Sequence, residues 1–216
     1  MFIGHLAVGL AAKRAAPRLS LGVLMAAAMF ADMLWPILVL LGIEEVRIVP
    51  GITRVTPLEF VSYPWSHSLV MLIVWGLAFG WLVRHRDPRA LVVVAAAVVS
   101  HWVLDWITHR PDMPIYPGSA RFGLALWNSV AGTVVVEVGM FLAGAWMYFQ
   151  ATRPRGRTGV ASIWILLGLL LAIYFGDMAS AAPPPSVNAI ATVGIGAAVL
   201  FTAWSTWADR YREVRW

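Results

Sequence analysis

Six apolar runs, each about long enough to cross a lipid bilayer, divide this 216-residue chain and constrain its fold more than any other feature. A helix rises 1.5 Å per residue, so about 20 apolar residues cross a hydrocarbon core about 30 Å thick. The runs are Leu19 to Leu41, Ser66 to Val83, Ala90 to Thr108, Leu124 to Phe149, Val160 to Gly176 and Val187 to Ala208. Phe2 to Ala12 is too short to span and predicts a half-helix packed against the first span. We predict an all-α, polytopic membrane helix bundle.

Composition supports this fold class and limits the chemistry. Hydrophobic residues make up 60% of the chain and charged residues only 12%, far from the values of a soluble domain. The net charge of +5 lies in short clusters between apolar runs rather than along one face, so we expect no nucleic-acid partner. The chain has no cysteine, and any metal must therefore be held by imidazole and carboxylate groups.

The basic residues predict how the bundle is oriented. Twelve of the sixteen fall on one side of the six-span arrangement: Lys13, Arg14, Arg18, Arg84, Arg86, Arg89, Arg153, Arg155, Arg157, Arg210, Arg212 and Arg215. The other side receives Arg47, Arg54, Arg110 and Arg121. Since cytoplasmic loops carry the excess of Lys and Arg, both termini are expected in the cytoplasm of a bacterium or archaeon, with the protein in the plasma (inner) membrane.

Ionisable residues inside the third run point to a functional site. His101, Asp105 and His109 are four residues apart, so they share one helical face. Charge-capable side chains within a membrane-length segment are costly and mark a functional site by default. The simpler alternative for His101 and Asp105 is a hydrogen-bonded pair that only holds helices together.

Further histidines and acids are predicted to lie at a similar depth. Counted from the basic clusters at 1.5 Å per residue, Asp32, His67, His101, Asp105 and Glu137 fall about 18 to 26 Å into the bilayer. His5 reaches about 14 Å on the same scale, and His109 and Asp112 lie at the outer mouth. These eight residues are our candidate ligands for one or more divalent metal ions, with zinc favoured. The alternatives are a helix cap for His67 and a protonated structural carboxyl for Glu137.

Several motifs resemble the YdjM-like family of membrane proteins, which are described as membrane-bound metal-dependent hydrolases. They are Gly4-His5, Asp32, Tyr63-Pro64-Trp65-Ser66-His67-Ser68-Leu69, Ser100-His101-Trp102-Val103-Leu104-Asp105, His109-Arg110-Pro111-Asp112 and Gly123-Leu124-Ala125-Leu126-Trp127-Asn128-Ser129. The resemblance covers roughly residues 1–150. That family is in turn distantly similar to the zinc-dependent phospholipase C and P1 nuclease superfamily, which implies a zinc cluster held by His and Asp ligands.

These features predict a membrane-bound metal-dependent hydrolase of a phosphoester such as a phospholipid or lipid-linked phosphate, with its site near the outer face. Asp32 or Glu137 is the candidate general base, Arg110 or Arg121 would pair with phosphate oxygens, and Asn128 would orient a ligand or the substrate. A divalent metal ion or proton transporter is the main alternative. A scaffold with a purely structural polar layer is the second.

The chain is predicted to form one integral membrane domain, 1–216, in which 1–150 carries the metal site and 151–216 adds two helices. The added helices carry no identifiable chemistry. Small residues on the last of them would permit close helix contact and a homo-oligomer; they are Ala191, Gly194, Gly196, Ala197 and Ala198.

Overall fold

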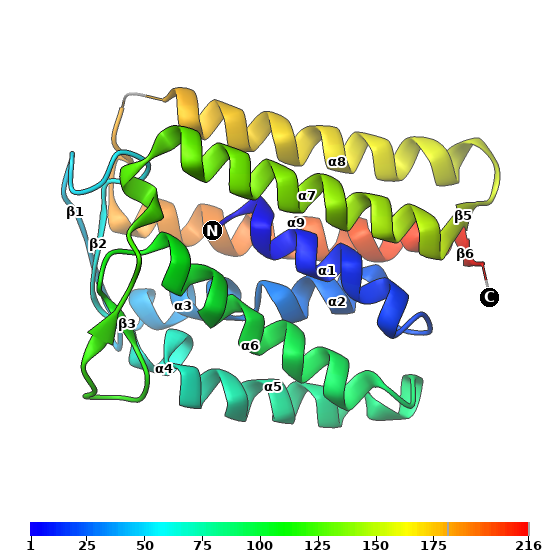
Figure 1. The fold of residues 1–216 in the computed structure, drawn as a ribbon, viewed down its shortest axis with the longest axis horizontal. Coiled ribbons are helices and arrows are strands. Elements are labelled where there is room, and N and C mark those ends of the chain that lie inside the picture. Colours follow the sequence, from blue (N-terminus) through cyan, green and yellow to red (C-terminus); the bar gives the residue numbers. More distant parts are fainter. Residues whose placement is uncertain (181, 216) are drawn as a thin grey trace.

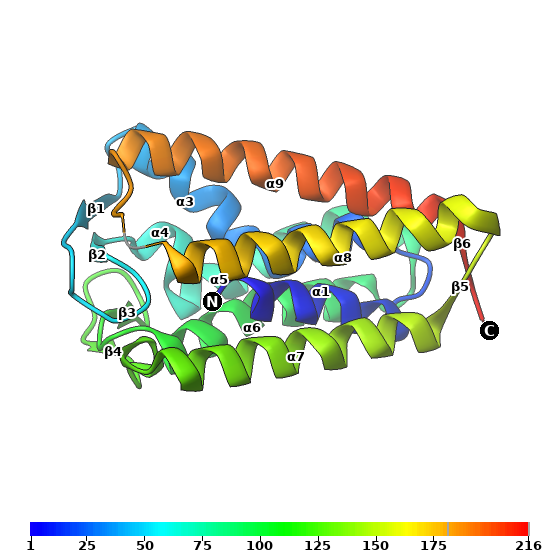
Figure 2. The ribbon, with the colours of Figure 1, turned by 90° about the horizontal axis from the view of Figure 1, so that it is seen from above.

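A computed structural model describes residues 1–180 and 182–215 and places most of them in helices that run side by side along one axis (Figures 1 and 2). The helices are α1 (Ile3–Ala15), α2 (Leu21–Ala28), α3 (Phe30–Leu40), α4 (Pro64–His67), α5 (Leu69–Val83), α6 (Ala90–Thr108), α7 (Val130–Ala151), α8 (Gly156–Ala179) and α9 (Val187–Arg210), with single 3-10 turns η1 (Arg84–Arg86) and η2 (Leu126–Asn128). The predicted all-α bundle is confirmed.

Among the described residues, five helices are long and apolar enough to cross a membrane: α5 with the following η1 turn, α6, α7, α8 and α9. The sixth predicted span, Leu19 to Leu41, is not one straight helix. It is divided at Met29 into α2 and α3, which are bent by 59° relative to each other. The bend places a helix C-terminus and a helix N-terminus in the middle of the bundle, where the last carbonyls and first N–H groups of a helix lack intrahelical partners.

The short N-terminal helix α1 lies inside the bundle rather than beside it. Figure 1 shows the N-terminus between the two ends of the molecule, with α1 alongside α7 and in front of α9. Close approach to α7 depends on Gly144, since a Cβ there would overlap the backbone of Ala7. The predicted half-helix is therefore a central element that brings His5 into the core.

Short strands close the two ends of the bundle. At one end lie the antiparallel pairs β1 (Glu45–Ile48) with β2 (Leu58–Ser62), and β3 (Met113–Pro114) with β4 (Arg121–Phe122); at the other end β5 (Thr152–Pro154) pairs with β6 (Arg212–Val214). We name these the hairpin end and the C-terminal end (Figure 1). The β1–β2 hairpin forms in the segment between α3 and α4, where the all-α prediction included no strands.

The four basic clusters of the sequence all lie at the C-terminal end. One cluster lies at the end of α1, one in the α5–α6 turn, one in the α7–α8 turn and one at the end of α9. The structure thus supports a bundle with one strongly basic end, and the predicted cytoplasmic position of that end remains a prediction.

Candidate metal centre

Five segments bring ionisable side chains to one point in the hairpin half of the bundle. His5 comes from α1, Asp32 from the first turn of α3, His67 from α4, and His101 and Asp105 from α6; His109 follows directly after α6. All except Asp32 are buried. Residues far apart in the sequence therefore form one cluster, which we call the Asp105 cluster.

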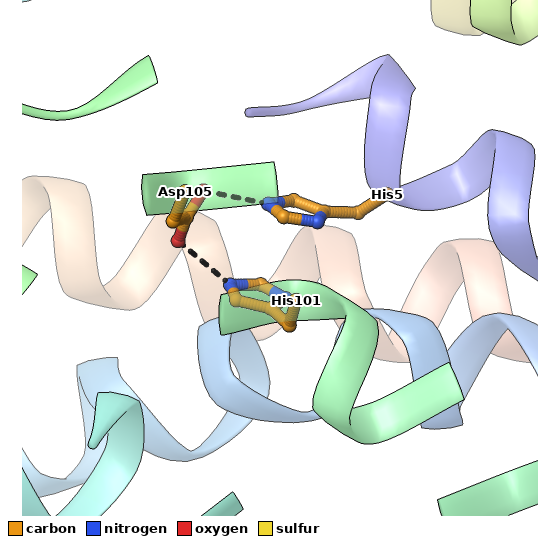
Figure 3. A group of neighbouring side chains, drawn as sticks. All are labelled: His5, His101 and Asp105. Carbon is orange, nitrogen blue, oxygen red and sulfur yellow. Dashed lines mark hydrogen bonds and ion pairs between the residues drawn. The ribbon is translucent and has the colours of Figure 1, made fainter. Parts of the chain in front are cut away.

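The carboxylate of Asp105 lies at the centre of this cluster. Its Oδ1 is 3.0 Å from His5 Nε2, and its Oδ2 is 3.1 Å from His101 Nε2 (Figure 3). The same Oδ2 lies 3.6 Å from His109 Nε2 and 3.8 Å from His67 Nε2. Four imidazoles from four segments thus direct the same ring nitrogen toward one carboxylate.

Asp32 provides a second carboxylate on the other side of the histidines. Its Oδ1 lies 3.6 Å from His67 Nε2 and 3.7 Å from His101 Nε2. Two sets of possible ligand atoms result, each lying within 4.8 Å of one another: His5, His101 and Asp105, and Asp32, His67 and His101. The two sets share His101 and together offer enough metal-ligand atoms for more than one ion.

Three of these histidines are also held by a hydrogen bond at Nδ1, the ring nitrogen that faces away from Asp105. His101 Nδ1 lies 2.9 Å from the carbonyl oxygen of Ala28, the last residue of α2 before the bend, and His109 Nδ1 lies 3.0 Å from Asp112 Oδ1. A carbonyl or carboxylate oxygen only accepts, so Nδ1 donates in both rings. In a neutral ring, Nε2 then carries a lone pair that points at Asp105.

His67 is held in the same tautomer by a longer chain. The Ser66 hydroxyl donates to Glu44 Oε2 at 2.6 Å, and it lies 2.7 Å from His67 Nδ1. Because its single proton goes to Glu44, Ser66 accepts from His67 Nδ1. Glu44 Oε1 is fixed in turn by the backbone N–H groups of Trp65 and Ser66 at 2.8 and 2.9 Å.

The outcome is an excess of electron pairs at the centre. In their neutral forms, His67, His101 and His109 direct Nε2 lone pairs at carboxylate oxygens. His101 Nε2 and His5 Nδ1 have no hydrogen-bond partner among the residues that the structure describes. Metal-bound histidines commonly donate their second N–H to a carboxylate or carbonyl in this way. The N–O separations of 3.1 to 3.8 Å bracket the edge of a tetrahedron with ligands about 2.1 Å from zinc, which is about 3.4 Å.

Tyr63 completes the support of His109. Its hydroxyl donates to Asp112 Oδ1 at 2.8 Å, the same oxygen that accepts from His109. Burial and the neighbouring Asp112 carboxylate raise the pKa of Tyr63 well above its ordinary value, so the phenol stays a neutral donor. Asp112, predicted as a ligand at the outer mouth, therefore contacts His109 on the ring nitrogen that faces away from Asp105. His109, also predicted at the mouth, lies within the cluster.

Glu137 reaches the cluster from α7 but bonds to the start of the chain. Its Oε2 accepts from the backbone N–H groups of Phe2 and Gly4, at 2.8 and 3.2 Å. The Met1 nitrogen lies 2.6 Å from Asp105 Oδ1. These contacts hold the first turn of α1 and so determine where the His5 ring lies, stacked 3.6 Å from that of His101.

A cavity of about 180 Å³ opens onto the cluster. Asp32, His67, Asp105, His109 and Glu137 line its polar side. Leu58 and Phe60 of β2 and Trp127 of η2 cover it from the hairpin end, and Phe60 and Trp127 pack against the His109 ring with centroids 4.8 and 4.2 Å away. A small polar group could thus reach the carboxylates under an aromatic cover.

Three other predicted site residues lie away from this cavity. Arg110 is partly exposed and lies 4.0 Å from Glu59, and Asn128 is exposed at the end of η2. Arg121 donates to the backbone oxygen of Val61 and lines a separate cavity beside Tyr63. The structure does not bring these side chains to the Asp105 cluster.

Sequence reasoning missed the outer partners of the histidines. Glu44, Ser66, Tyr63 and the Ala28 carbonyl were not assigned roles, although Ser66 and Tyr63 lie in the motif that drew attention to His67. Proximity in the sequence could have indicated Ser66. No sequence signal connects Glu44 to Ser66 or Ala28 to His101, because both contacts depend on the packing of segments that are separate in the sequence.

Comparison with known protein families gives a match over most of the chain. The family model described as YdjM inner membrane protein matches residues 1–181, which include every residue of the Asp105 cluster and extend through α8. No curated protein and no solved structure matches the chain.

Proposed function

The chain belongs to the YdjM inner membrane protein family, and we propose that within this family it acts as a metal-dependent hydrolase of a phosphoester, with a divalent ion, preferentially zinc, held by the Asp105 cluster. The proposed ligands are His5, Asp32, His67, His101, Asp105 and His109. Their imidazole and carboxylate donors suit zinc and similar transition metals, and their number suits more than one ion.

The observation that carries this proposal is the direction of the histidine lone pairs. The alternative is that protons, rather than metal ions, lie between the rings and the carboxylates. Protonating His67, His101 and His109 would place three positive charges against Asp32 and Asp105 in a buried site, where charge is costly. A divalent ion lets all three rings stay neutral while both carboxylates remain ionised.

When bound, such an ion supplies two effects: it polarises a phosphoryl oxygen and lowers the pKa of a water molecule. Where it does not serve as a ligand, Asp32 is the better placed general base because its side chain is 34% exposed, whereas that of Asp105 is only 2% exposed. Glu137 serves instead to position α1, since its Oε2 already accepts two backbone hydrogen bonds. Phe60 and Trp127 exclude bulk water from the cavity.

The proposed substrate is a phospholipid or lipid-linked phosphate. With the basic C-terminal end in the cytoplasm, the cavity would lie in the outer half of the membrane near the lipid headgroups. The resemblance of the His101 and Asp105 spacing to the zinc-dependent phospholipase C and P1 nuclease superfamily also supports phosphoester chemistry.

Transport of a metal ion or proton is less well supported. Between the cluster and the C-terminal end, α1, α2 and α6 pack through buried apolar side chains that include Leu10, Leu24, Ala27, Val94 and Val98. A carrier needs polar groups toward both faces of the membrane. Among the residues that the structure describes, the cavity lined by polar members of the Asp105 cluster extends toward the hairpin end.

The experiment compares two histidine variants of the full-length protein purified from membranes. His101→Ala removes a shared ligand, and His85→Ala removes an exposed histidine of the α5–α6 turn as the control. Wild type and His85→Ala should contain metal by mass spectrometry and should hydrolyse bis(p-nitrophenyl) phosphate, whereas His101→Ala should do neither. Equal metal content in all three proteins would refute the metal centre, and metal without turnover of any phosphoester would refute the hydrolase.

A further inference from the structure

A second cavity, almost entirely apolar, lies next to the metal centre. It has a volume of about 200 Å³ and is enclosed by α1, the bent pair α2–α3, and α9. Its walls include Met25, Met29 and Met33 on one side and Ala197 and Phe201 on the other. Of the described residues that line it, Asp32 alone is ionisable. We call this cavity the α9 chamber.

The α9 chamber adjoins the cavity of the metal centre. Phe2 and Asp32 line both. Asp32 is also the one member of the Asp105 cluster whose side chain is substantially exposed, at 34%. A molecule in the chamber therefore contacts the candidate metal centre at Asp32.

The lining of the chamber is elongated along α9, which fits a chain better than a compact ligand. It runs from Ile190 to Thr202, thirteen residues that extend over about 18 Å of helix. Asp32 lies part of the way along, and Met25, Phe201 and Thr202 lie farther toward the C-terminal end. The space beyond Asp32 thus points toward the middle of the bundle, as the acyl chain of a lipid does when its phosphate lies in the hairpin half.

Small and flexible side chains form this space. Gly194, Ala197 and Ala198 keep the α9 wall open, and several of the lining residues, including Met29 and Met33, are only half-buried. Methionine adapts its unbranched side chain to irregular apolar ligands. Since α3 and α9 have the composition of membrane spans, the surrounding solvent for this wall is the hydrocarbon of the bilayer.

We propose that the α9 chamber binds one acyl chain of a membrane phospholipid and thereby places the phosphate of that lipid beside Asp32. The proposal rests on the proposed function and narrows it, because it makes a chain-bearing lipid the substrate rather than a water-soluble phosphoester. The chamber would supply affinity through apolar burial, and Asp32 would mark the boundary between the chain and the reacting phosphate.

Two glycines on the same helix provide a matched pair of variants. A Cβ at Gly194 would meet only Pro36, with its nearest atom at 3.6 Å, so a leucine there fits the backbone and extends into the chamber. A Cβ at Gly196 would meet no described atom within 4 Å. Gly194→Leu and Gly196→Leu therefore make the same chemical change, one inside the chamber and one outside it.

The probe is phosphatidylglycerol with a photoreactive diazirine in one acyl chain, added to full-length protein in lipid nanodiscs. In wild type and Gly196→Leu, peptides from α9 and α3 that line the chamber should be labelled. Gly194→Leu should reduce this labelling by about tenfold, the discrimination that a few methylene groups produce in an apolar pocket. Unlabelled dipalmitoyl phosphatidylglycerol should compete, whereas glycerol phosphate, which has no acyl chain, should not.

Equal labelling of the two leucine variants, or competition by glycerol phosphate, would overturn the proposal. Metal content and turnover of bis(p-nitrophenyl) phosphate are measured in the same samples. If both are normal while labelling ignores Gly194→Leu, the chamber proposal fails and the hydrolase survives. If labelling depends on Gly194 but metal is absent from wild type, the chamber is correct and the proposed function fails.

Discussion

Two buried polar clusters lie at opposite ends of this bundle, and they differ in how their charges and hydrogen bonds are balanced. At the C-terminal end, Lys13 Nζ lies 2.6 Å from Asp209 Oδ2 and donates to the carbonyl of Leu19 at 2.8 Å. Asp209 also accepts from the Leu21 N–H and the Tyr148 hydroxyl, at 3.0 and 2.9 Å. Every oxygen and charge of this Asp209 cluster has a partner.

The Asp105 cluster has no such balance. The Met1 nitrogen donates to Asp105 Oδ1, but the remaining acceptors outnumber the donors. Three histidines donate outward through Nδ1 and, when neutral, present lone pairs inward to two carboxylates. A cluster that only joins helices, like the Asp209 cluster, pairs each acceptor with a donor. Burial alone therefore does not distinguish a structural polar cluster from a cation site. The two differ in whether each acceptor receives a hydrogen bond from a donor in the cluster.

Replacing the central carboxylate gives the largest expected effect. Asp105→Asn keeps the size of the side chain but removes a charged ligand that contacts four histidines. Loss of an outer partner can lower metal affinity by about 100-fold, and we expect loss of this central ligand to lower it further. Competition with a zinc-selective chelator measures this affinity. Asp209→Asn, the same change in the other cluster, should leave it unaltered, and a loss in both variants would remove the distinction.

Breaking the Asp209 cluster should affect stability rather than metal. Lys13→Met leaves Asp209 without its cation, and both side chains are less than a tenth exposed. We expect the free energy of unfolding to decrease by about 3–5 kcal/mol, the usual cost of an unpaired buried charge. Unfolding by denaturant in detergent micelles measures it. The double variant Lys13→Met with Asp209→Leu should recover much of the loss, and unchanged stability in Lys13→Met would contradict this role.

Removing metal should destabilise the hairpin half of the bundle. A ligand at about 100 times its dissociation constant stabilises a folded protein by about 2.7 kcal/mol. Treatment of wild type with a chelator should therefore lower its thermal midpoint, and added zinc should restore it. His101→Ala, which lacks the shared ligand, should not respond to either treatment. A chelator response of equal size in His101→Ala would show that the metal binds elsewhere.

A smaller effect is expected from the chain that orients His67. The amide introduced by Glu44→Gln can donate to the Ser66 hydroxyl, which then donates to His67 Nδ1. The proton of the His67 ring would then lie on Nε2, where it would face the metal ion. Metal affinity should fall by about 10- to 100-fold while the fold is kept. The control is Glu45→Gln, whose carboxylate lies on the surface and pairs with Arg47. Equal affinity in the two variants would limit the role of Glu44 to packing.

The helical architecture was predictable because it depends on local composition. Apolar runs of membrane length specify spans wherever they occur. The four basic clusters correctly indicated which helix ends lie together at one end of the bundle. The depth count also brought together Asp32, His67, His101 and Asp105, because helices that cross one layer share a common axis. It placed His109 at the mouth because a count of residues along the helix axis does not show that the His109 ring lies against Asp105.

The bend at Met29 illustrates what local sequence did not reveal. No glycine or proline stands at this position, and Pro36 lies inside α3 without ending it. The division lets the Ala28 carbonyl reach His101 and puts Asp32 in a first helical turn. Both consequences arise from the packing of α2 and α3 against α6 and α9, which a pattern of apolar residues does not encode.

The amino-acid sequence by itself determined that this chain is a membrane bundle and which ionisable residues are too costly to bury without a purpose, since both follow from transfer free energies that each residue carries with it. Only the tertiary structure decided which nitrogen of each histidine faces inward, that Glu44 and Ala28 fix those rings, and that an apolar chamber meets the site at Asp32. Those features depend on distances between segments 100 or more residues apart, such as that from His5 to Asp105 or from Phe2 to Thr202 across the chamber. Hydrogen-bond direction exists only once both partners are in place.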